Sequence, residues 1–293
     1  MHAVGFIGIG KMGWPMATNL VKAGFDVCVA DEQPGRAASF AAEVGGRGAL
    51  SNREAADGAD ALVTMLPTSG HVVAALDEAS TALRPGLIVV EMSSGVPSMT
   101  QSLASELRDR GVTLVDCPVS GGVARAVTGE LSMMVGGEPD AVARVMPLLL
   151  AMGKSVHHCG AAGAGHAMKA LNNLVSAGGF LVGIEALLIG KRFGLEPARM
   201  LEVLNASTGT NNSTQNKFAQ FVLSRAFDSG FGLDLMVKDL GIATDMADDA
   251  GVVAPFSTLC AQLWASAANV MGPGHDHTEM ARFSETVAGF EVA

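Results

Sequence analysis

The first half of the sequence alternates short apolar runs of strand length with segments of helix-forming residues. Each run is continuous and is bounded by a turn residue or an acidic residue. Continuous apolar runs are typical of parallel strands that helices cover on both faces. The pattern therefore predicts an α/β fold with a doubly wound parallel sheet. The predicted strands are Val4–Ile9, Phe25–Ala30, Ala59–Leu66, Gly86–Glu91 and Val112–Asp116, with Leu131–Val135 and Ser155–Cys159 extending the sheet.

Strand-like runs disappear after Gly160, where the glycine-rich joint AAGAGH opens a helical second half. This change predicts two domains, residues 1–163 with the sheet and residues 164–293 with helices alone. Apolar residues make up 49% of the chain and charged residues 16%, which excludes a disordered chain. The predicted helices of the second half are His166–Phe193, Pro197–Ala206, Thr214–Arg225, Leu233–Ala250 and Pro255–Met271.

Charge and cysteine usage narrow the range of partners and compartments. The chain carries 19 Lys and Arg against 29 Asp and Glu, a formal net charge of -10, with no basic block. We therefore expect neither nucleic acid nor an anionic membrane surface as a partner. The four cysteines are scattered without a C-x-x-C pair, and the start MHAVGFIGIG does not resemble a signal peptide. These features favour a reduced, cytoplasmic protein.

Two further patterns suggest a membrane span and a metal site, and we expect neither. The apolar stretch Leu171–Gly190 is long enough for a membrane span, but it contains Glu185, so we expect a long helix buried in protein. His157-His158-Cys159 and His275-Asp276-His277 lack further ligands at a zinc-binding spacing. We predict a structural role for both triplets and no metal site.

A glycine motif, Gly8-Ile9-Gly10-Lys11-Met12-Gly13, lies between the first predicted strand and the first predicted helix. In this context G-x-G-x-x-G is typical of a dinucleotide-binding turn. The first glycine allows the tight turn, the second lets the backbone approach a pyrophosphate, and the third lets helix and strand pack closely. The helix that follows directs its amides and its dipole toward the phosphates. We therefore predict that all six residues contact the cofactor.

Asp31 ends the second predicted strand, eighteen residues after Gly13. A carboxylate at this place accepts hydrogen bonds from the adenosine ribose hydroxyls. Together with Glu32 it would repel a 2′-phosphate, so the sequence favours NAD over NADP. Arg36 leaves the alternative open, because its side chain could turn back to a phosphate.

Lys169 and Asn173 are four residues apart at the start of the long helix and therefore share one face. Their neighbours are small or apolar, so we expect the lysine to be partly desolvated. Desolvation lowers the pKa of a lysine and suits it to proton transfer near neutral pH. Upstream, Ser120-Gly121-Gly122 follows the strand Val112–Asp116, where a hydroxyl and two amides could hold a carboxylate.

Four segments together resemble the signature blocks of the β-hydroxyacid dehydrogenase family. They are GFIGIGKMGWPMATNLVKAG, DCPVSGGVARAVTGELSMMVGG, GAGHAMKALNNL and LMVKDLGIA, in the family's order and spread over almost the whole chain. The family includes 3-hydroxyisobutyrate dehydrogenase and tartronate semialdehyde reductase. The resemblance implies a Rossmann-type domain followed by an all-α domain, joined by a long interdomain helix. It also implies a homodimer or homotetramer formed through the helical half.

The resemblance assigns roles to single residues. It implies that Lys169 is the catalytic acid and base and that Asn173 positions the substrate. The family's imine-reducing relatives generally lack this lysine, so its presence favours alcohol or aldehyde chemistry. Further matches are Ser120, Gly121 and Gly122 for the substrate carboxylate, Lys238 for the nicotinamide end of the site, Ser94 near the nicotinamide ribose, and Leu66 and Pro67 along the cofactor path.

The chain is thereby expected to be an NAD(P)-dependent 3-hydroxy acid dehydrogenase. Neutral Lys169 would take the hydroxyl proton of a small β-hydroxy acid while a hydride moves to the nicotinamide. Two alternatives stay open, a semialdehyde reductase of the tartronate or succinic type that works in the opposite direction, and a dinucleotide-binding module without turnover. The polar segment Asn205–Lys217 favours a substrate more hydrophilic than 3-hydroxyisobutyrate, or is an ordinary solvated loop.

Overall fold

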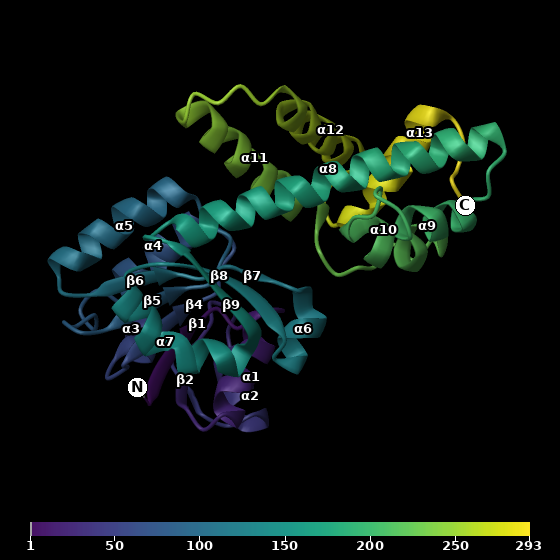
Figure 1. Cartoon of the computed structure of the whole chain (residues 1–293). Helices are drawn as coiled ribbons and strands as arrows, with labels where there is room; N and C mark the ends of the chain where they lie inside the picture. The colour runs from purple at the N-terminus through teal and green to yellow at the C-terminus, as the bar shows by residue number, and fades with distance from the viewer. Residues whose placement is uncertain (1) are drawn as a thin grey trace. The chain divides into compact units, whose positions relative to one another are not determined.

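The computed structural model describes residues 2–293 of the chain. Its internal contacts divide the protein into two compact units, Met1–Lys169 and Ala170–Ala293 (Figure 1). The division falls inside helix α8, Ala164–Phe193, which therefore begins in the first unit and continues through the second. The sequence places its domain boundary just before this helix, after Gly163.

The first unit contains a sheet whose first six strands run parallel in the order β3-β2-β1-β4-β5-β6. Strand β1 pairs with β2 on one side and with β4 on the other, so the chain order reverses there. In open α/β sheets ligands bind at such a switch point, outside the carboxyl ends of the strands. The bounds are β1 Ala3–Ile7, β2 Asp26–Ala30, β3 Arg47–Gly48, β4 Ala61–Thr64, β5 Ile88–Glu91 and β6 Thr113–Asp116.

Three more strands extend the sheet beyond β6, but not all in the same direction. β8, Leu131–Gly136, runs antiparallel to β6 and to the short β7, Val119–Ser120. β9, Gly153–Gly160, pairs with β8 in parallel. The sequence predicts β8 and β9 as strands, whereas the reversal of direction depends on pairing partners that a local pattern does not specify.

Helices cover both faces of this sheet, and adjacent residues of β1 point into two different cores. Phe6 belongs to a core that also contains buried residues of α1, α2 and α7, while Ile7 belongs to a core that contains buried residues of α3, α4 and α5. This arrangement explains why the strands are continuously apolar, since neither face meets water. The helices of this unit are α1 Gly13–Lys22, α2 Arg36–Glu43, α3 Asn52–Ala56, α4 Ser69–Glu78, α5 Pro97–Asp109, α6 Gly122–Thr128 and α7 Pro139–Met152.

The second unit is built from helices around one aromatic core. Phe180 of α8 lies at the centre, with its ring 5.0 Å from that of Phe218 and 5.7 Å from that of Trp264. All three side chains are fully buried. The helices are α9 Pro197–Asn205, α10 Asn212–Asn216, α11 Leu233–Asp249, α12 Pro255–Met271 and α13 Met280–Ala288, with a π-helix η1 Phe218–Leu223 and a 3-10 helix η2 His277–Glu279.

The prediction of one helix over Thr214–Arg225 is wrong. Asn211 caps α10, which ends at Asn216, and the chain leaves helical geometry at Lys217 before η1 begins. Phe218, fully buried, turns into the core at this break. Burial of that ring therefore prevails over a continuous helix, and helix propensity is only a weak guide to such a choice.

Helix α8 is long and apolar enough to cross a membrane by length and composition alone. However, 56% of its most apolar window is buried inside the protein. A core helix of a globular domain passes the same test, so this helix gives only weak support for a membrane span.

Candidate active site

The loop from Gly8 to Gly13 joins β1 to α1 at the switch point, and glycine is required at both of its ends. Gly8 has a φ of +91°, and a Cβ there would lie 2.4 Å from the carbonyl oxygen of Met65. A Cβ on Gly13 would lie 1.9 Å from the carbonyl oxygen of Gly8. At Gly10, by contrast, a Cβ would meet no non-neighbouring heavy atom of residues 2–293 within 4 Å. The loop is thus tight at its ends and open in its middle, where a pyrophosphate can approach the backbone.

The other three residues of the loop, Ile9, Lys11 and Met12, lie in the same turn, and Ile9 connects it to Asp31. The Ile9 amide donates to Asp31 Oδ2 at 2.9 Å. Asp31 Oδ1 accepts from the Gln33 amide at 2.9 Å. It also accepts from the Arg36 guanidinium at 3.3 Å. Asp31 therefore holds the glycine loop. Arg36, the residue that could bind the 2′-phosphate of NADP, lies directly beside Asp31.

Leu66 and Pro67 follow β4, and Leu66 lies against the glycine loop, since a Cβ on Gly8 would meet its side chain at 2.7 Å. The Leu66 amide donates to the hydroxyl of buried Ser93 at 2.9 Å. Ser94, which the resemblance selects, is half-buried and comes next in the chain. Ser93 therefore joins the ends of β4 and β5, a role that the sequence analysis does not assign.

The loop after β7 contains Ser120, Gly121 and Gly122. Ser120 pairs with Ser132 of β8, and the two glycines have φ angles of +131° and +66°. Residues that carry a side chain rarely adopt such positive φ angles, so this turn favours glycine. A Cβ on Gly121 would lie 2.6 Å from Cδ of Arg125, whose side chain lies against the loop. The carboxylate-binding role of these residues stays a prediction.

The first unit also contains a buried ionic network that the sequence analysis misses. His166, on the first turns of α8, is 1% exposed and contacts Glu91 Oε2 through Nε2 at 2.6 Å. Its amide donates to Asp116 Oδ2 at 2.9 Å, and the Gly163 amide donates to Asp116 Oδ1 at 2.7 Å. Glu91 and Asp116 are the last residues of β5 and β6. The network therefore fixes the start of α8 to the carboxyl ends of two strands.

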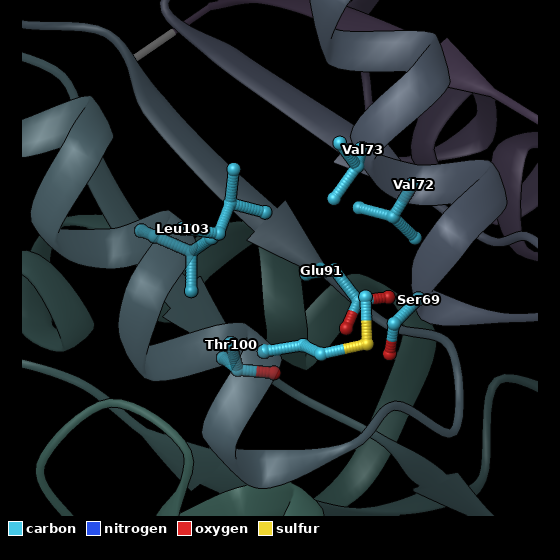
Figure 2. A pocket seen from close by; sticks show the side chains of 8 residues that line it. Ser69, Val72, Val73, Glu91, Thr100 and Leu103 are labelled. Carbon is cyan, nitrogen blue, oxygen red and sulfur yellow. The ribbon is translucent and has the colours of Figure 1, made fainter.

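The charges of this network stabilise one another. Burial by itself lowers the pKa of His166, but the charge of Glu91 and its hydrogen bond raise that pKa above its ordinary value. Burial by itself raises the pKa of Glu91, but His166 lowers it below its ordinary value. Glu91 also lines a small pocket with Ser69 and Thr100 (Figure 2). Acidic residues at the ends of two neighbouring strands are the signal that could have identified this network.

Lys169 is the sixth residue of α8, three positions after His166, and it is 7% exposed. A lysine is almost never this buried without a specific reason. Because α8 is continuous here, Lys169 and Asn173 lie one turn apart on the same face. The structure therefore places the predicted acid and base on a helix whose start is held by the buried network.

In the second unit, Asn173 is held by an acid of α11. Its Nδ2 donates to Asp239 Oδ2 at 2.6 Å, and both side chains are buried. Lys238 Nζ lies 3.5 Å from Asp239 Oδ1. Asp239 thus links two predicted site residues, although no pattern in the sequence predicts a role for Asp239 itself. The side-chain NH2 group of asparagine carries two protons, so Nδ2 retains a second donor besides the one that Asp239 accepts.

Residues 3–160 match the family described as the NAD binding domain of 6-phosphogluconate dehydrogenase. Residues 163–284 match the family described as NAD-binding of NADP-dependent 3-hydroxyisobutyrate dehydrogenase. The 2-(hydroxymethyl)glutarate dehydrogenase of Eubacterium barkeri is 34% identical over 99% of this chain and 97% of its own.

The chain belongs to the β-hydroxyacid dehydrogenase family. Another relative is the NAD-dependent L-serine dehydrogenase of Pseudomonas aeruginosa, 36% identical over 90% of this chain and 91% of that protein. A solved structure of Mycobacterium tuberculosis 3-hydroxyisobutyrate dehydrogenase with L-serine has a TM-score of 0.90, with 32% identity over 97% of this chain and 99% of that one.

Family membership makes the protein an oxidoreductase with an NAD(P)-binding domain. The predicted fold class is confirmed, a Rossmann-type sheet domain followed by a helical domain. Within residues 2–293, no group of three or more His, Cys, Asp and Glu side chains is arranged to hold a metal ion. The open face over Gly10 and the carboxylate of Asp31 fit the cofactor of this β-hydroxyacid dehydrogenase.

Proposed function

We propose that this β-hydroxyacid dehydrogenase oxidises a small 3-hydroxy acid, with Lys169 as the catalytic acid and base. The observation that carries the proposal is a lysine 7% exposed, one helical turn before an asparagine that Asp239 holds at 2.6 Å. The relatives' substrates, 2-(hydroxymethyl)glutarate, L-serine and 3-hydroxyisobutyrate, all carry a hydroxyl on the carbon β to a carboxylate. That shared group supports a small anionic hydroxy acid as the substrate of this chain.

In the proposed site, Ser120, Gly121 and Gly122 bind the substrate carboxylate through one hydroxyl and two amides. Asn173 donates its second amide proton to a substrate oxygen, and Asp239 fixes the direction of that donor. In this proposed site Lys238 faces the nicotinamide end of the bound cofactor. Fixing both ends of a small substrate supplies the orientation that catalysis needs.

The proton step belongs to Lys169. Its neutral amine takes the hydroxyl proton as the alcohol becomes a carbonyl, and its ammonium form returns that proton in the reducing direction. A bound nicotinamide supplies the hydride acceptor. Semialdehyde reduction is therefore the reverse of the same reaction, and one arrangement of residues serves both.

We propose NAD rather than NADP as the cofactor, bound by Gly8 to Gly13 and Asp31, with Leu66, Pro67 and Ser94 along its length. Asp31 and Glu32 favour a ribose with free hydroxyls over one that carries a phosphate. Arg36 is already paired with Asp31, and this ion pair reduces the attraction of the arginine for a second anion. Substituting Asp31→Ala should reduce kcat/KM for NAD by about 10–100-fold and that for NADP by less.

Substituting Lys169→Ala tests the mechanism, with Lys191→Ala on the same helix as the matched control. We expect the first variant to lose at least about 100-fold in kcat, since general acid and base catalysis typically contributes this much or more. Its affinity for NADH, measured by fluorescence titration, should stay within about threefold. The control should retain both properties.

Activity of Lys169→Ala at the wild-type level, with every accepted substrate, would contradict the mechanism. Wild-type protein that binds NADH but oxidises no member of a panel of 3-hydroxy acids would instead favour the dinucleotide-binding module. A preference for NADP in the same panel would reverse the cofactor proposal alone.

We further propose that residues 1–163 form the cofactor domain and residues 164–293 the substrate and assembly domain. The helical half carries exposed apolar side chains along α8, among them Val175, Ile189 and Phe193, as expected of a surface that joins copies into a homodimer or homotetramer. The four cysteines are unpaired, which supports a cytoplasmic location. Light scattering on the purified protein tests the assembly.

A further inference from the structure

The polar segment Asn205–Lys217 is fixed onto α8 by specific hydrogen bonds. Asn211 donates from Nδ2 to the Gly179 carbonyl at 3.3 Å, and its Oδ1 accepts from the Thr214 amide at 3.1 Å. Asn205 Nδ2 donates to the Thr214 carbonyl at 3.0 Å. The asparagines of this segment therefore hold the backbone in place, rather than being a solvated loop.

Lys217 lies at the end of this segment, where the chain passes from α10 into the π-helix η1. The next residue, Phe218, is fully buried, and a Cβ on Gly183 of α8 would lie 2.5 Å from its ring. The capped helix α10 before Lys217 and the buried ring of Phe218 after it thus fix the backbone of the lysine. Its half-buried ammonium donates to the hydroxyl of Ser176 on α8 at 3.2 Å. π-helical turns frequently occur at functional sites.

Ser176 belongs to the same stripe of α8 as the predicted catalytic residues. Lys169, Asn173 and Ser176 follow the spacing i, i+4 and i+7, so they line one face of the helix. The axial distance from Asn173 to Ser176 is about 4.5 Å. A cation therefore lies one turn beyond the asparagine that is proposed to bind the substrate.

We propose that Lys217 and Ser176 form a subsite for a second anionic group of the substrate, so that the preferred substrate is a 3-hydroxy acid with a short acidic tail. This inference rests on the proposed function and names its substrate class. The ammonium supplies a positive charge and three N–H donors, one of which Ser176 accepts, and a serine hydroxyl that accepts from a lysine still has its own proton to donate. The distance of one helical turn suits a tail of about two or three carbons.

Partial burial makes this subsite selective. A half-buried cation interacts with an anion more strongly than a solvated one does, because less water screens the pair. A substrate with a methyl group in the same place leaves the ammonium without that anion. The subsite therefore discriminates between two substrates that share the reacting carbon and differ only in the tail.

A matched pair of substrates tests the subsite, 2-(hydroxymethyl)glutarate with an acidic tail and 3-hydroxyisobutyrate with a methyl group. We expect the wild-type protein to prefer the first by at least about tenfold in kcat/KM. Lys217→Met should reduce kcat/KM for the acidic substrate by about 10–100-fold and that for 3-hydroxyisobutyrate by less than about threefold. Lys217→Arg should retain most of the preference, and Lys191→Met is the control for a lysine lost elsewhere on the surface.

Binding measured without turnover separates this inference from the proposed mechanism. Calorimetry on Lys169→Ala protein saturated with NAD should show tighter binding of 2-(hydroxymethyl)glutarate than of 3-hydroxyisobutyrate, and adding Lys217→Met should abolish the difference. Equal affinities for the pair, or equal losses for both after Lys217→Met, overturn the subsite even if the enzyme turns both over. Absence of turnover in the wild-type protein, together with a retained affinity difference in the Lys169→Ala protein, contradicts the mechanism and leaves the subsite supported.

Discussion

Each unit of the molecule buries a histidine beside an acidic side chain, His166 in the first and His277 in the second. His166 is 1% exposed and lies 2.6 Å from Glu91, whose charge raises the pKa of the imidazole. His277 is 4% exposed and lies 3.5 Å from Asp276. Its pKa is nevertheless lowered, first by burial and further by the charge of Lys217, against the opposing influence of Asp276.

The difference lies in what else the acid contacts. Asp276 accepts hydrogen bonds from the amide and hydroxyl of Thr278, the hydroxyl of Ser229 and the amide of Gly230. Burial by itself raises the pKa of Asp276, but the hydrogen bonds from His277, Thr278 and Ser229 hold that pKa well below its ordinary value. The acid is therefore stabilised by several neutral donors, whereas Glu91 depends largely on the charge of His166.

The surroundings of the two rings match this difference. His277 stacks on Trp264 at 17° and lies near Phe180, inside the aromatic core of the second unit. Such surroundings favour a neutral imidazole. His166 lies among polar groups, with Thr100 Oγ1 2.8 Å from its Nδ1. Burial thus disfavours charge at both rings, and the number of alternative donors to the acid decides in which direction the pKa of each ring is shifted.

The largest effect on stability should come from His166→Leu, which leaves Glu91 and Asp116 buried without their cation. Removing one partner of a buried ion pair costs about 3–5 kcal/mol. The matched variant His277→Leu leaves Asp276 with its other donors and should cost about 1–2 kcal/mol. Urea unfolding of both variants measures the two losses, and equal losses would show that the two sites do not differ as described.

Glu91→Gln should have a smaller effect, about 1–3 kcal/mol, because the amide oxygen can still accept from His166 while the charge is removed. The variant should also lower the pKa of His166, measured by NMR titration of its ring protons. Asp276→Asn should change the pKa of His277 less. If the pKa of His166 stayed raised in Glu91→Gln, the charge of Glu91 would not be the cause of that upward shift.

The pH dependence of stability separates the two histidines by sign. The folded-state pKa of His166 lies above its ordinary value of 6.5, so its contribution is complete below about pH 6.5 and is lost as the pH rises through the folded-state value. The pKa of His277 is lowered, so its contribution is present above pH 6.5 and is lost as the pH falls.

Unfolding curves measured in steps from pH 5 to pH 9 test these signs. The difference in stability between the wild-type protein and His166→Leu should narrow as the pH rises above 6.5, by at most about 1.4 kcal/mol per pH unit. The difference for His277→Leu should instead narrow as the pH falls below 6.5. Differences that stay constant with pH would mean that neither ring changes its protonation on unfolding.

The smallest expected effect is that of Asp276→Asn, about 1 kcal/mol. The variant retains one acceptor oxygen for the cap of η2, but its other carboxylate oxygen is replaced by an NH2 group, which donates instead of accepting. Thermal unfolding at pH 7, with Asp228→Asn on the same unit as a surface control, measures it. A loss as large as that of His166→Leu would show that the charge of Asp276, and not its cap, stabilises this region.

Local features of the sequence predicted most of the sheet and the cofactor loop. β2, β4, β5 and β6 lie within predicted apolar runs, and β1 begins one residue before its run, because burial on both faces demands continuous apolar residues. The two-residue strands β3 and β7 give no such signal, since pairing alone defines them. The helix α13 is also absent from the prediction. The helix predicted over Thr214–Arg225 failed because the burial of one ring, that of Phe218, decided the backbone there.

For the candidate site, spacing along one helix placed Lys169 and Asn173 on a common face, since helix periodicity is a local property. Their partners escaped prediction. Glu91 contacts His166 across 75 positions of sequence, and Asn173 contacts Asp239 across 66. No local pattern specifies such pairs.

The sequence by itself determined the glycine turn, the parallel strands, the long helix and the family, because each depends on residues close together in the chain or on composition. Only the tertiary structure decided which acid holds which base, that Arg36 pairs with Asp31, and that Lys217 reaches the face of Asn173 through Ser176. The physical reason is that a charge responds to whatever lies within a few ångströms of it, and folding, not sequence order, sets those neighbours.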